Sequence, residues 1–411
     1  AYSFIIKCFD FESSEEKVIM NLLKKIYCRT FQSVLKAALP FLPYRKPEII
    51  HSVHGIPQIL EKKKCDHILI ITDTGIIRNG LLTRLEDTLD RHFIPYIIYD
   101  GTVANPTTTN VNEALALYHE YDCNAIIGFG GGSSIDCAKA VGARVAKPHQ
   151  PLAKMKGILK VHKKLPLLIA IPTTAGTGSE TTLAAVITDA ETRHKYPIND
   201  FPLIPQVAVL DPKVTASLPP ALTATTGMDA LTHAVEAYIG NSTTAGTRAD
   251  ALFAVKMIFE NIDRAFHDGS DLEARKNMLL AAFSAGCAFS KSYVGYVHAV
   301  AHSLGGEYNV PHGLANAVLL PFVLESYGHT IDTKLHQLAI AAGVADEATP
   351  ESQAATQFIQ AIKDMKKRFS IGDTIPQIRE EDIPKLASYA EKEANPLYPV
   401  PVLMDARQLE S

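Results

Sequence analysis

The chain has 411 residues, of which 47% are hydrophobic and 20% are charged, and its formal net charge is −4. This ordinary globular composition favours two domains over a single core, and the weakly acidic balance lacks the basic footprint of a nucleic-acid-binding protein. No apolar run approaches the length of a membrane span, so no contact with the interior of a membrane is expected.

The cysteines and the first residues bear on the compartment. Six cysteines are scattered without a CxxC pair, which indicates reduced thiols and neither a disulfide framework nor a thiolate zinc site. The N-terminal stretch is acidic, unlike a secretory signal or an acid-poor transit peptide. We therefore expect a cytoplasmic protein. The acidic residues concerned are Asp10, Glu12, Glu15 and Glu16.

Residues 1–46 are predicted to form a helical extension ahead of the first domain. Apolar residues recur at helical spacing, first within 18–26 and then within 31–38. This pattern predicts two short amphipathic helices that end at Pro40 and Pro43. Their apolar faces require a partner, which is either the body of the same subunit or the second subunit of a homodimer.

Residues 47–219 alternate short β-rich runs with helical stretches. This alternation is typical of an α/β domain with a mainly parallel sheet, here a Rossmann-like dinucleotide-binding domain. The predicted strands are His67–Thr72, Pro95–Tyr99, Ala125–Phe129, Pro166–Ile171, Ala184–Thr188 and Val207–Leu210.

The third predicted strand ends in a glycine-rich turn that leads into a helix predicted over 134–145. Glycines such as Gly131 and Gly132 let the backbone approach a phosphate closely, and the free N–H groups from Ser133 onward can hold the anion. The order of strand, glycines and helix suits a dinucleotide, although the spacing is not that of the usual fingerprint. A glycine-rich turn without a ligand is the alternative.

Two further features favour a bound cofactor. Asp73 follows the strand that ends at Thr72, where a carboxylate accepts hydrogen bonds from the adenosine ribose and repels a 2′-phosphate, so NAD is favoured over NADP. The loop Pro172–Glu180 follows another buried strand and offers hydroxyl groups to the cofactor. These hydroxyl groups belong to Thr173, Thr174, Thr177 and Ser179.

Residues 220–411 are predicted to form an all-helical second domain. The β pattern ends after Pro219-Pro220, and helical periodicity continues from Ala221 to about Glu393. The predicted interruptions are Gly240-Asn241, Gly269, Gly305-Gly306, Gly328 and Gly343.

Two pairs of polar residues stand out within the helical domain. Asp229 and His233 are four residues apart on one predicted helix, and His298 and His302 are four apart on another, so each pair shares a helix face. Either pair alone is more often a surface pair or a core histidine. Both lie among Ala, Val, Leu and Gly, where an uncompensated Asp229 would be costly to bury. Together the pairs indicate a metal site.

A fifth residue completes this hypothesis. Gly305-Gly306 are expected to end the second helix, and Pro311 restarts the chain so that His312 can face His298. One carboxylate oxygen and up to three imidazole nitrogens suit Fe(II) or Zn(II). Residue types alone do not choose between His298 and His302 as a ligand.

Four sequence blocks resemble those of the iron-containing (group III) alcohol dehydrogenases, over roughly Glu48 to Pro396 and in the order and spacing of that family. By this resemblance the metal ligands are Asp229, His233, His298 and His312, whereas His302 is a non-ligand beside the nicotinamide. The blocks are Gly131–Asp136, Pro172–Glu180, Asp229-x3-His233 and His298-x3-His302-x9-His312-Gly313.

The resemblance also assigns residues to the cofactor site that the pattern alone does not. Asp136 belongs to the first block, and Asn105 and Lys195 lie outside all four. Without the resemblance, Lys195 reads as a solvated lysine in a polar stretch. Dehydroquinate synthases and glycerol dehydrogenases share the implied architecture, so the fold alone does not settle the reaction.

These features predict a metal-dependent, NAD-linked dehydrogenase that interconverts a short primary alcohol or diol and its aldehyde, with its active site in the cleft between the domains. The metal would act as a Lewis acid and the nicotinamide would exchange hydride. Alternatives are a glycerol-dehydrogenase-like or maleylacetate-reductase-like enzyme, or a nucleotide-binding protein without catalysis. Dehydroquinate synthase is disfavoured, because few Lys or Arg surround the histidines. The sequence names neither the alcohol nor the metal.

His302 receives a separate hypothesis. It lies one turn beyond His298, displaced by about 6 Å along the helix axis, which is too far to share an ion comfortably. Imidazole gains and loses protons near neutral pH and is suited to pass the proton of the substrate hydroxyl to solvent. The alternative is that His302 forms only a steric wall.

Overall fold

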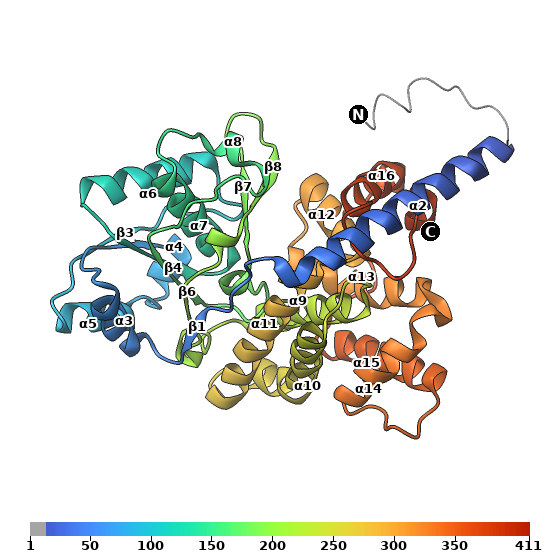
Figure 1. The fold of residues 1–411 in the computed structure, drawn as a ribbon. Helices are drawn as coiled ribbons and strands as arrows, with labels where there is room; N and C mark the ends of the chain where they lie inside the picture. Colours follow the sequence, from blue (N-terminus) through green and yellow to red (C-terminus); the bar gives the residue numbers. More distant parts are fainter. Residues whose placement is uncertain (1–13) are drawn as a thin grey trace.

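The structure, a computed structural model, describes residues 14–411, with side chains from residue 22 onward. An α/β unit and a helical unit lie side by side, and the long N-terminal helix extends along the helical unit (Figure 1). The acidic residues Asp10 and Glu12, expected to argue against a leader peptide, lie outside the described residues.

The α/β unit is built on a six-stranded parallel sheet in the order β1-β9-β6-β4-β2-β3. Its four interior strands are fully buried, as apolar strands covered on both faces should be. Five of the six predicted strands lie in this sheet, which confirms the Rossmann-like α/β class. The strands are β1 (Glu48–Ile50), β2 (Ile68–Ile71), β3 (Tyr96–Tyr99), β4 (Ala125–Gly130), β6 (Leu167–Pro172) and β9 (Val207–Val209).

Helices cover both faces of this sheet (Figure 1). Along β2, Ile68 and Ile70 pack with α3 and α5, whereas Leu69 and Ile71 pack with α6 and α7, as the alternation of side chains along a strand requires. The helices are α3 (Ile56–Lys63), α4 (Thr74–Arg78), α5 (Thr83–Arg91), α6 (Thr108–Glu120), α7 (Gly132–Ala146) and α8 (Leu152–Met155), with 3-10 turns at η2 (Val53–Gly55), η3 (Ser179–Thr181), η4 (Phe201–Leu203) and η5 (Pro212–Val214).

The sixth predicted strand belongs to a separate three-stranded sheet in the order β5-β8-β7. β7 (Ala184–Thr188) pairs antiparallel with β8 (Lys195–Asn199), and β5 (Gly157–Ile158) pairs parallel with β8. The sequence did not predict β5, which has only two residues, or β8, which contains Pro197 and polar residues of low strand propensity, and it also missed the three-residue β1 of the larger sheet.

The second unit is entirely helical among the described residues, which confirms the expected all-α domain. No helix among them combines the length and apolar composition that crossing a membrane requires. Its α-helices are α9 (Pro220–Ile239), α10 (Ala245–His267), α11 (Leu272–Ser292), α12 (Tyr296–Tyr308), α13 (His312–Ser326), α14 (Asp332–Ala341), α15 (Glu351–Arg368), α16 (Ile383–Ala394) and α17 (Ala406–Glu410), and its 3-10 turns are η6 (Gly328–Ile331) and η7 (Glu380–Asp382).

Gly305-Gly306 do not end α12, contrary to prediction. The helix continues to Tyr308 and stops at Asn309, whose φ of 55° is left-handed. Each glycine costs about 1 kcal/mol in a helix, but the last turn is anchored by side chains. Glu307 accepts two hydrogen bonds from Lys385, at 2.8 and 2.7 Å, and the Tyr308 hydroxyl donates to Asp382. Tertiary contacts therefore override the weak propensity.

The N-terminal extension forms one long helix, α2 (Ser14–Ala38), followed by the 3-10 turn η1 (Leu39–Phe41), and not two short helices. No Gly or Pro lies between the two predicted helices, so nothing interrupts the first. The segment packs on its own subunit: Arg29 donates to the carbonyls of Val400 and Pro401, at 2.7 and 2.8 Å. Its outer face leaves several apolar residues exposed, among them Leu23, Ile26 and Val34.

Candidate metal centre and cofactor site

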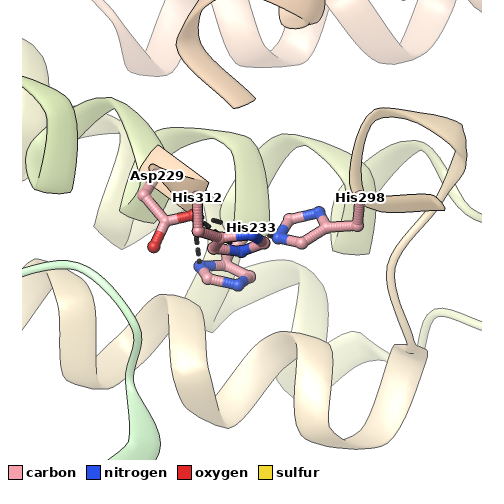
Figure 2. A group of neighbouring side chains, drawn as sticks. All are labelled: Asp229, His233, His298 and His312. Carbon is pink, nitrogen blue, oxygen red and sulfur yellow. Dashed lines mark ion pairs between the residues drawn. The ribbon is translucent and has the colours of Figure 1, made fainter. Parts of the chain in front are cut away.

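Three helices bring together Asp229, His233, His298 and His312 (Figure 2). Helix α9 supplies the first two, α12 supplies His298, and His312 is the first residue of α13. One possible ligand atom from each residue lies within 4.8 Å of all the others. Asp229 Oδ1 is 3.5 Å from His312 Nε2 and 3.9 Å from His298 Nε2.

The electrostatics of this cluster suit a cation. Burial lowers the pKa of His233, lowers that of His298 well below its usual range, and lowers that of His312 to about 4, so all three imidazoles are neutral near pH 7. Neutral imidazole is the form that binds metals. His233 Nδ1 is buried without a hydrogen-bond partner. Asp229 is only 2% exposed, and no Lys or Arg of the described chain pairs with it.

The four side chains of this cluster fit a divalent ion. A buried carboxylate without a counter-charge is costly, and an orphaned ring nitrogen beside it is a ligand without a partner. One ion bound between the four residues would satisfy both groups. The donor set of one oxygen and three nitrogens is the set that the sequence suggested.

Glu236 supports His298 from behind and was not anticipated from the sequence. His298 Nδ1 lies 2.6 Å from Glu236 Oε2, so its Nε2 atom faces the cluster. The Glu236 carboxylate also accepts hydrogen bonds from the backbone N–H groups of Gly295 and Val297, both at 2.8 Å. A Cβ atom on Gly295 would lie only 2.7 Å from Glu236 Oε1, so glycine is required there. Burial raises the pKa of Glu236 to about 7.

Asn316 also holds the cluster and was not anticipated. It lies one turn after His312 on α13, and its Nδ2 group donates to Asp229 Oδ1 at 2.6 Å. On the other side, the Phe289 ring stacks on His233 with a centroid distance of 4.1 Å. Asn316 could have been noticed as a polar residue at helical spacing from His312 in an otherwise apolar stretch.

His302 lies beside this cluster and not within it. Its ring stacks on that of His312, with centroids 5.2 Å apart and planes inclined by 17°, and its centroid is 6.0 Å from that of His298. The ring is half-exposed, and its Nδ1 atom lies 2.6 Å from Glu393 Oε1. His298 therefore lies within the cluster and His302 outside it, and the ligand role of His298 stays a prediction.

The glycine-rich turn lies at the carboxyl end of β4, where Gly131 precedes the first turn of α7 without any side-chain cap. The first N–H groups of α7 therefore stay available to an anion. Gly130 has a φ of +149°, and a Cβ atom there would lie 2.6 Å from Ser134 Oγ. A Cβ atom on Gly132 would lie 3.1 Å from the Thr177 side chain. Side chains at Gly130 and Gly132 would clash with Ser134 and Thr177, so these positions favour glycine and the backbone of the turn stays accessible.

Asp73 is placed next to this turn, because β2 and β4 are neighbours in the sheet. Its Oδ1 atom accepts hydrogen bonds from the N–H groups of Gly75 and Ile76, at 2.9 and 3.1 Å, and so caps α4. Its Oδ2 atom lies 3.4 Å from Ser134 Oγ. The capping role was not predicted, and one carboxylate oxygen still faces the glycine turn.

The remaining predicted cofactor residues gather around the same turn. Lys195 Nζ donates to Asn105 Oδ1 at 2.6 Å, and the Asn105 N–H group donates to Ser133 Oγ at 3.4 Å. The Thr173 N–H group donates to Gly130 O at 3.0 Å. Thr174 lies close by, 4.0 Å from where a Cβ atom on Gly131 would be.

Asp136 is different, because its carboxylate is used by the protein. It accepts hydrogen bonds from Ser179 Oγ at 2.7 Å and from the Val186 N–H group at 3.0 Å. It also lies 3.9 Å from the buried amine of Lys139, whose pKa burial lowers to about 8. Asp136 thus fastens α7 to the Pro172–Glu180 loop and β7, and its contact with a cofactor stays a prediction.

Charges near the glycine turn affect the pKa values of residues near the Asp229 cluster, and the reverse also holds. Burial lowers the pKa of Lys195, and the charges of Asp136 and Glu393 act in the opposite direction. The pKa of His312, lowered mainly by burial, is lowered further by the charge of Lys195. The charge of Lys195 in the α/β unit is therefore coupled to groups of the helical unit.

Comparisons with known proteins agree with this arrangement. Residues 50–212 match the family model for iron-containing alcohol dehydrogenase, and residues 223–409 match the model for the C-terminal part of the Fe-containing alcohol dehydrogenase family. Alcohol dehydrogenase 4 of Schizosaccharomyces pombe is 41% identical over 338 residues, which cover 80% of this chain and 79% of the relative. The chain belongs to the iron-containing alcohol dehydrogenase family.

Solved structures resemble this chain over most of its length. A crystal structure of a 1,3-propanediol oxidoreductase shares 34% identity and a TM-score of 0.86, over 90% of this chain and 98% of that one. Sulfoacetaldehyde reductase from Bifidobacterium kashiwanohense, in complex with NAD+, shares 27% identity and a TM-score of 0.79, over 90% and 96% of the chains. The predicted class, a metal-dependent, NAD-linked oxidoreductase of alcohols and aldehydes, is confirmed.

Proposed function

We propose that Asp229, His233, His298 and His312 bind one divalent metal ion, iron(II), with zinc(II) as the alternative. The observation that carries this proposal is the geometry of the cluster: the buried Asp229 carboxylate has no Lys or Arg partner among the described residues, and one ligand atom from each of the four residues lies within 4.8 Å of the others. One oxygen and three nitrogens suit both ions. When bound, the ion supplies Lewis acidity toward the oxygen of the substrate.

NAD(H) is the proposed dinucleotide, held at the carboxyl edge of the parallel sheet. The uncapped N–H groups after Gly131 face its phosphates, and Asp73 Oδ2, which also accepts from Ser134 Oγ, accepts from the adenosine ribose and disfavours a 2′-phosphate. When bound, the nicotinamide supplies the hydride acceptor or donor. The other proposed contacts are Asn105, Gly132, Ser133, Asp136, Thr173, Thr174, Thr177 and Lys195.

The proposed substrate is a short primary alcohol or diol, or the corresponding aldehyde. The names of the relatives support this class: an alcohol dehydrogenase, a 1,3-propanediol oxidoreductase and a sulfoacetaldehyde reductase. The active site is proposed to lie where the two units meet, since the Pro172–Glu180 loop of the α/β unit closely approaches α9 and α11 of the helical unit.

His302 is proposed to carry the proton of the substrate hydroxyl. Its ring stacks on His312 and is half-exposed, so it lies between the proposed metal site and solvent. During alcohol oxidation its Nε2 atom would accept the hydroxyl proton and release it to water. Aldehyde reduction would use the same atom in reverse.

The proposal extends to the domain boundaries, the oligomeric state and the location of the protein in the cell. We infer an extension at 1–46, a cofactor-binding domain at 47–219 and a metal-binding domain at 220–411. A homodimer is supported by the exposed apolar residues on the outer face of α2. A cytoplasmic location is supported by the five cysteines of the described residues, all of which are free thiols.

Elemental analysis and activity assays test the central assignment. The protein, purified without added metal, should contain about one iron or zinc atom per chain, and should use NADH with members of an aldehyde panel. His312→Ala should lose both the metal and turnover, because one of four ligands is missing, while still binding NADH. Full metal occupancy in His312→Ala would refute the proposed ligand set.

A further inference from the structure

His302 is the end of a hydrogen-bonded chain that begins in the C-terminal segment. Its Nδ1 atom lies 2.6 Å from Glu393 Oε1, near the end of α16. The same oxygen accepts a hydrogen bond from the Tyr398 hydroxyl at 2.7 Å. These residues are about 90 positions from His302 in the sequence, and the spacing of the histidines gave no reason to expect them.

The chemistry of Glu393 fixes the tautomer of His302. Glu393 Oε1 accepts a hydrogen bond from the Tyr398 hydroxyl at 2.7 Å and lies 2.6 Å from His302 Nδ1. An oxygen that already accepts from Tyr398 is also the acceptor toward Nδ1, because a carboxylate only accepts hydrogen bonds. His302 Nδ1 must carry a proton, so in the neutral ring Nε2 is the acceptor.

The position of the His302 ring leaves its Nε2 atom available to accept a proton. None of the described residues hydrogen-bonds His302 Nε2, and the ring lies flat against His312. An imidazole held by a carboxylate at one nitrogen presents its other nitrogen in a fixed direction. Without Glu393, rotation of the ring and exchange of tautomers would divide Nε2 among several arrangements.

The segment that carries Glu393 and Tyr398 is itself held in place. The Tyr296 hydroxyl of α12 donates to Asn395 Oδ1 at 3.0 Å. The buried Gln32 of α2 donates to the carbonyl of Tyr398 at 2.7 Å. The N-terminal extension thus braces the same segment that contacts His302.

We propose that Glu393 is a positioning residue that holds His302 with Nδ1–H bound and Nε2 directed at the substrate, and that Tyr398 holds Glu393. This inference rests on the proposed proton transfer by His302. It adds a group whose proposed effect on the reaction passes through the histidine. Its role therefore differs from that of the metal ligands and of Glu236.

Two substitutions at position 393 test the inference. Glu393→Gln still offers an oxygen to Nδ1–H, and its kcat should stay within about five-fold of the wild type. Glu393→Leu offers none, and its kcat should fall by about 10- to 100-fold, with KM for NAD and metal content unchanged. Nitrogen-15 spectra of histidine-labelled, zinc-loaded enzyme should show the Nδ1–H tautomer in the wild type and Glu393→Gln, but a mixture in Glu393→Leu.

Several outcomes decide the matter. Wild-type kcat or a retained tautomer in Glu393→Leu overturns the inference, and so does loss of metal in that variant, since Glu393 would then support the fold. An equal fall in Glu393→Gln would mean that charge matters and not position. Glu391→Gln, two residues away and paired with Lys24, is the matched control and should be unchanged. Full turnover in His302→Ala would contradict the proposed role of His302, and with it this inference. Full turnover in Glu393→Leu together with reduced turnover in His302→Ala would contradict this inference alone.

Discussion

Asp73 illustrates how one side chain serves the fold and the ligand at once. One oxygen caps α4 through Gly75 and Ile76, and the other faces the glycine turn. A substitution that removes the charge but keeps the cap isolates the second role. Asn and Asp are about equally good N-caps, and Gly is weaker by only a few tenths of a kcal/mol.

Asp73→Asn and Asp73→Gly should both raise the preference for NADP. Each removes the negative charge that disfavours a 2′-phosphate, and the NADP-to-NAD ratio of kcat/KM should rise by about ten-fold or more, equivalent to about 1.4 kcal/mol. Steady-state kinetics with both cofactors measure this ratio, and thermal unfolding controls for the cap. An unchanged ratio in both variants would mean that Asp73 acts only on α4.

His302→Ala should keep the metal but lose roughly 100-fold in turnover near neutral pH, because no side chain then accepts the substrate proton. Turnover should recover partly at high pH, where hydroxide accepts the proton. Metal analysis and a pH profile of kcat measure the two effects. Loss of metal would make His302 a ligand, whereas wild-type turnover with an unchanged profile would leave it a steric wall.

The sequence predicted the residues whose roles depend on helical spacing, and missed those whose roles depend on tertiary contacts. Asp229 and His233 share a helix face wherever that helix lies. Glu236 acquires its role only because the turn at Gly295 brings two N–H groups and His298 to it. Glu393 meets His302 only through the packing of α16 against α12.

At the scale of elements, local sequence pattern decided which strands could be predicted. β2, β4 and β6 are continuous apolar runs because both of their faces are covered, and the pattern is visible in the sequence. β5 has only two residues and β8 contains Pro197 and polar residues, so their local sequences carry little strand preference.

Helix ends were predicted less well than helices, for a similar reason. The expected stop at Gly305-Gly306 rested on propensity, whereas the observed stop at Asn309 follows contacts of Glu307 and Tyr308 with η7 and α16. The two helices expected to end at Pro40 and Pro43 are instead the single helix α2, which ends at Ala38, and the 3-10 turn η1, which contains Pro40.

At the scale of the whole molecule, each unit supplies one half of the proposed site. The loop after β6 joins them closely: a Cβ atom on Gly178 would lie 2.8 Å from Gly286 of α11, and one on Gly176 would lie 2.8 Å from Thr226 of α9. Both glycines therefore permit a close approach of the α/β unit to the helices that carry or support the proposed ligands. The Pro172–Glu180 loop is therefore packed directly against α9 and α11.

Removal of the metal should affect the two units differently. The four proposed ligands tie together α9, α12 and α13 and lie wholly in the helical unit. An ion that binds only the folded state stabilises it by about 2.7 kcal/mol when its free concentration is 100 times Kd. For a unit of nearly 200 residues this corresponds to a fall in Tm of about 5–10 °C on chelation.

NADH binding should survive the same treatment, because none of the proposed ligands contributes to the glycine turn or to Asp73. Calorimetry with and without a chelator, together with NADH fluorescence, measures both effects in one preparation. Adding back iron(II) or zinc(II) should restore Tm, and His312→Ala should show the lower Tm whether or not metal is added. An unchanged Tm after complete removal of metal would mean that the four residues hold no structural ion. Loss of NADH binding together with the metal would instead mean that the two halves of the site fold as one unit.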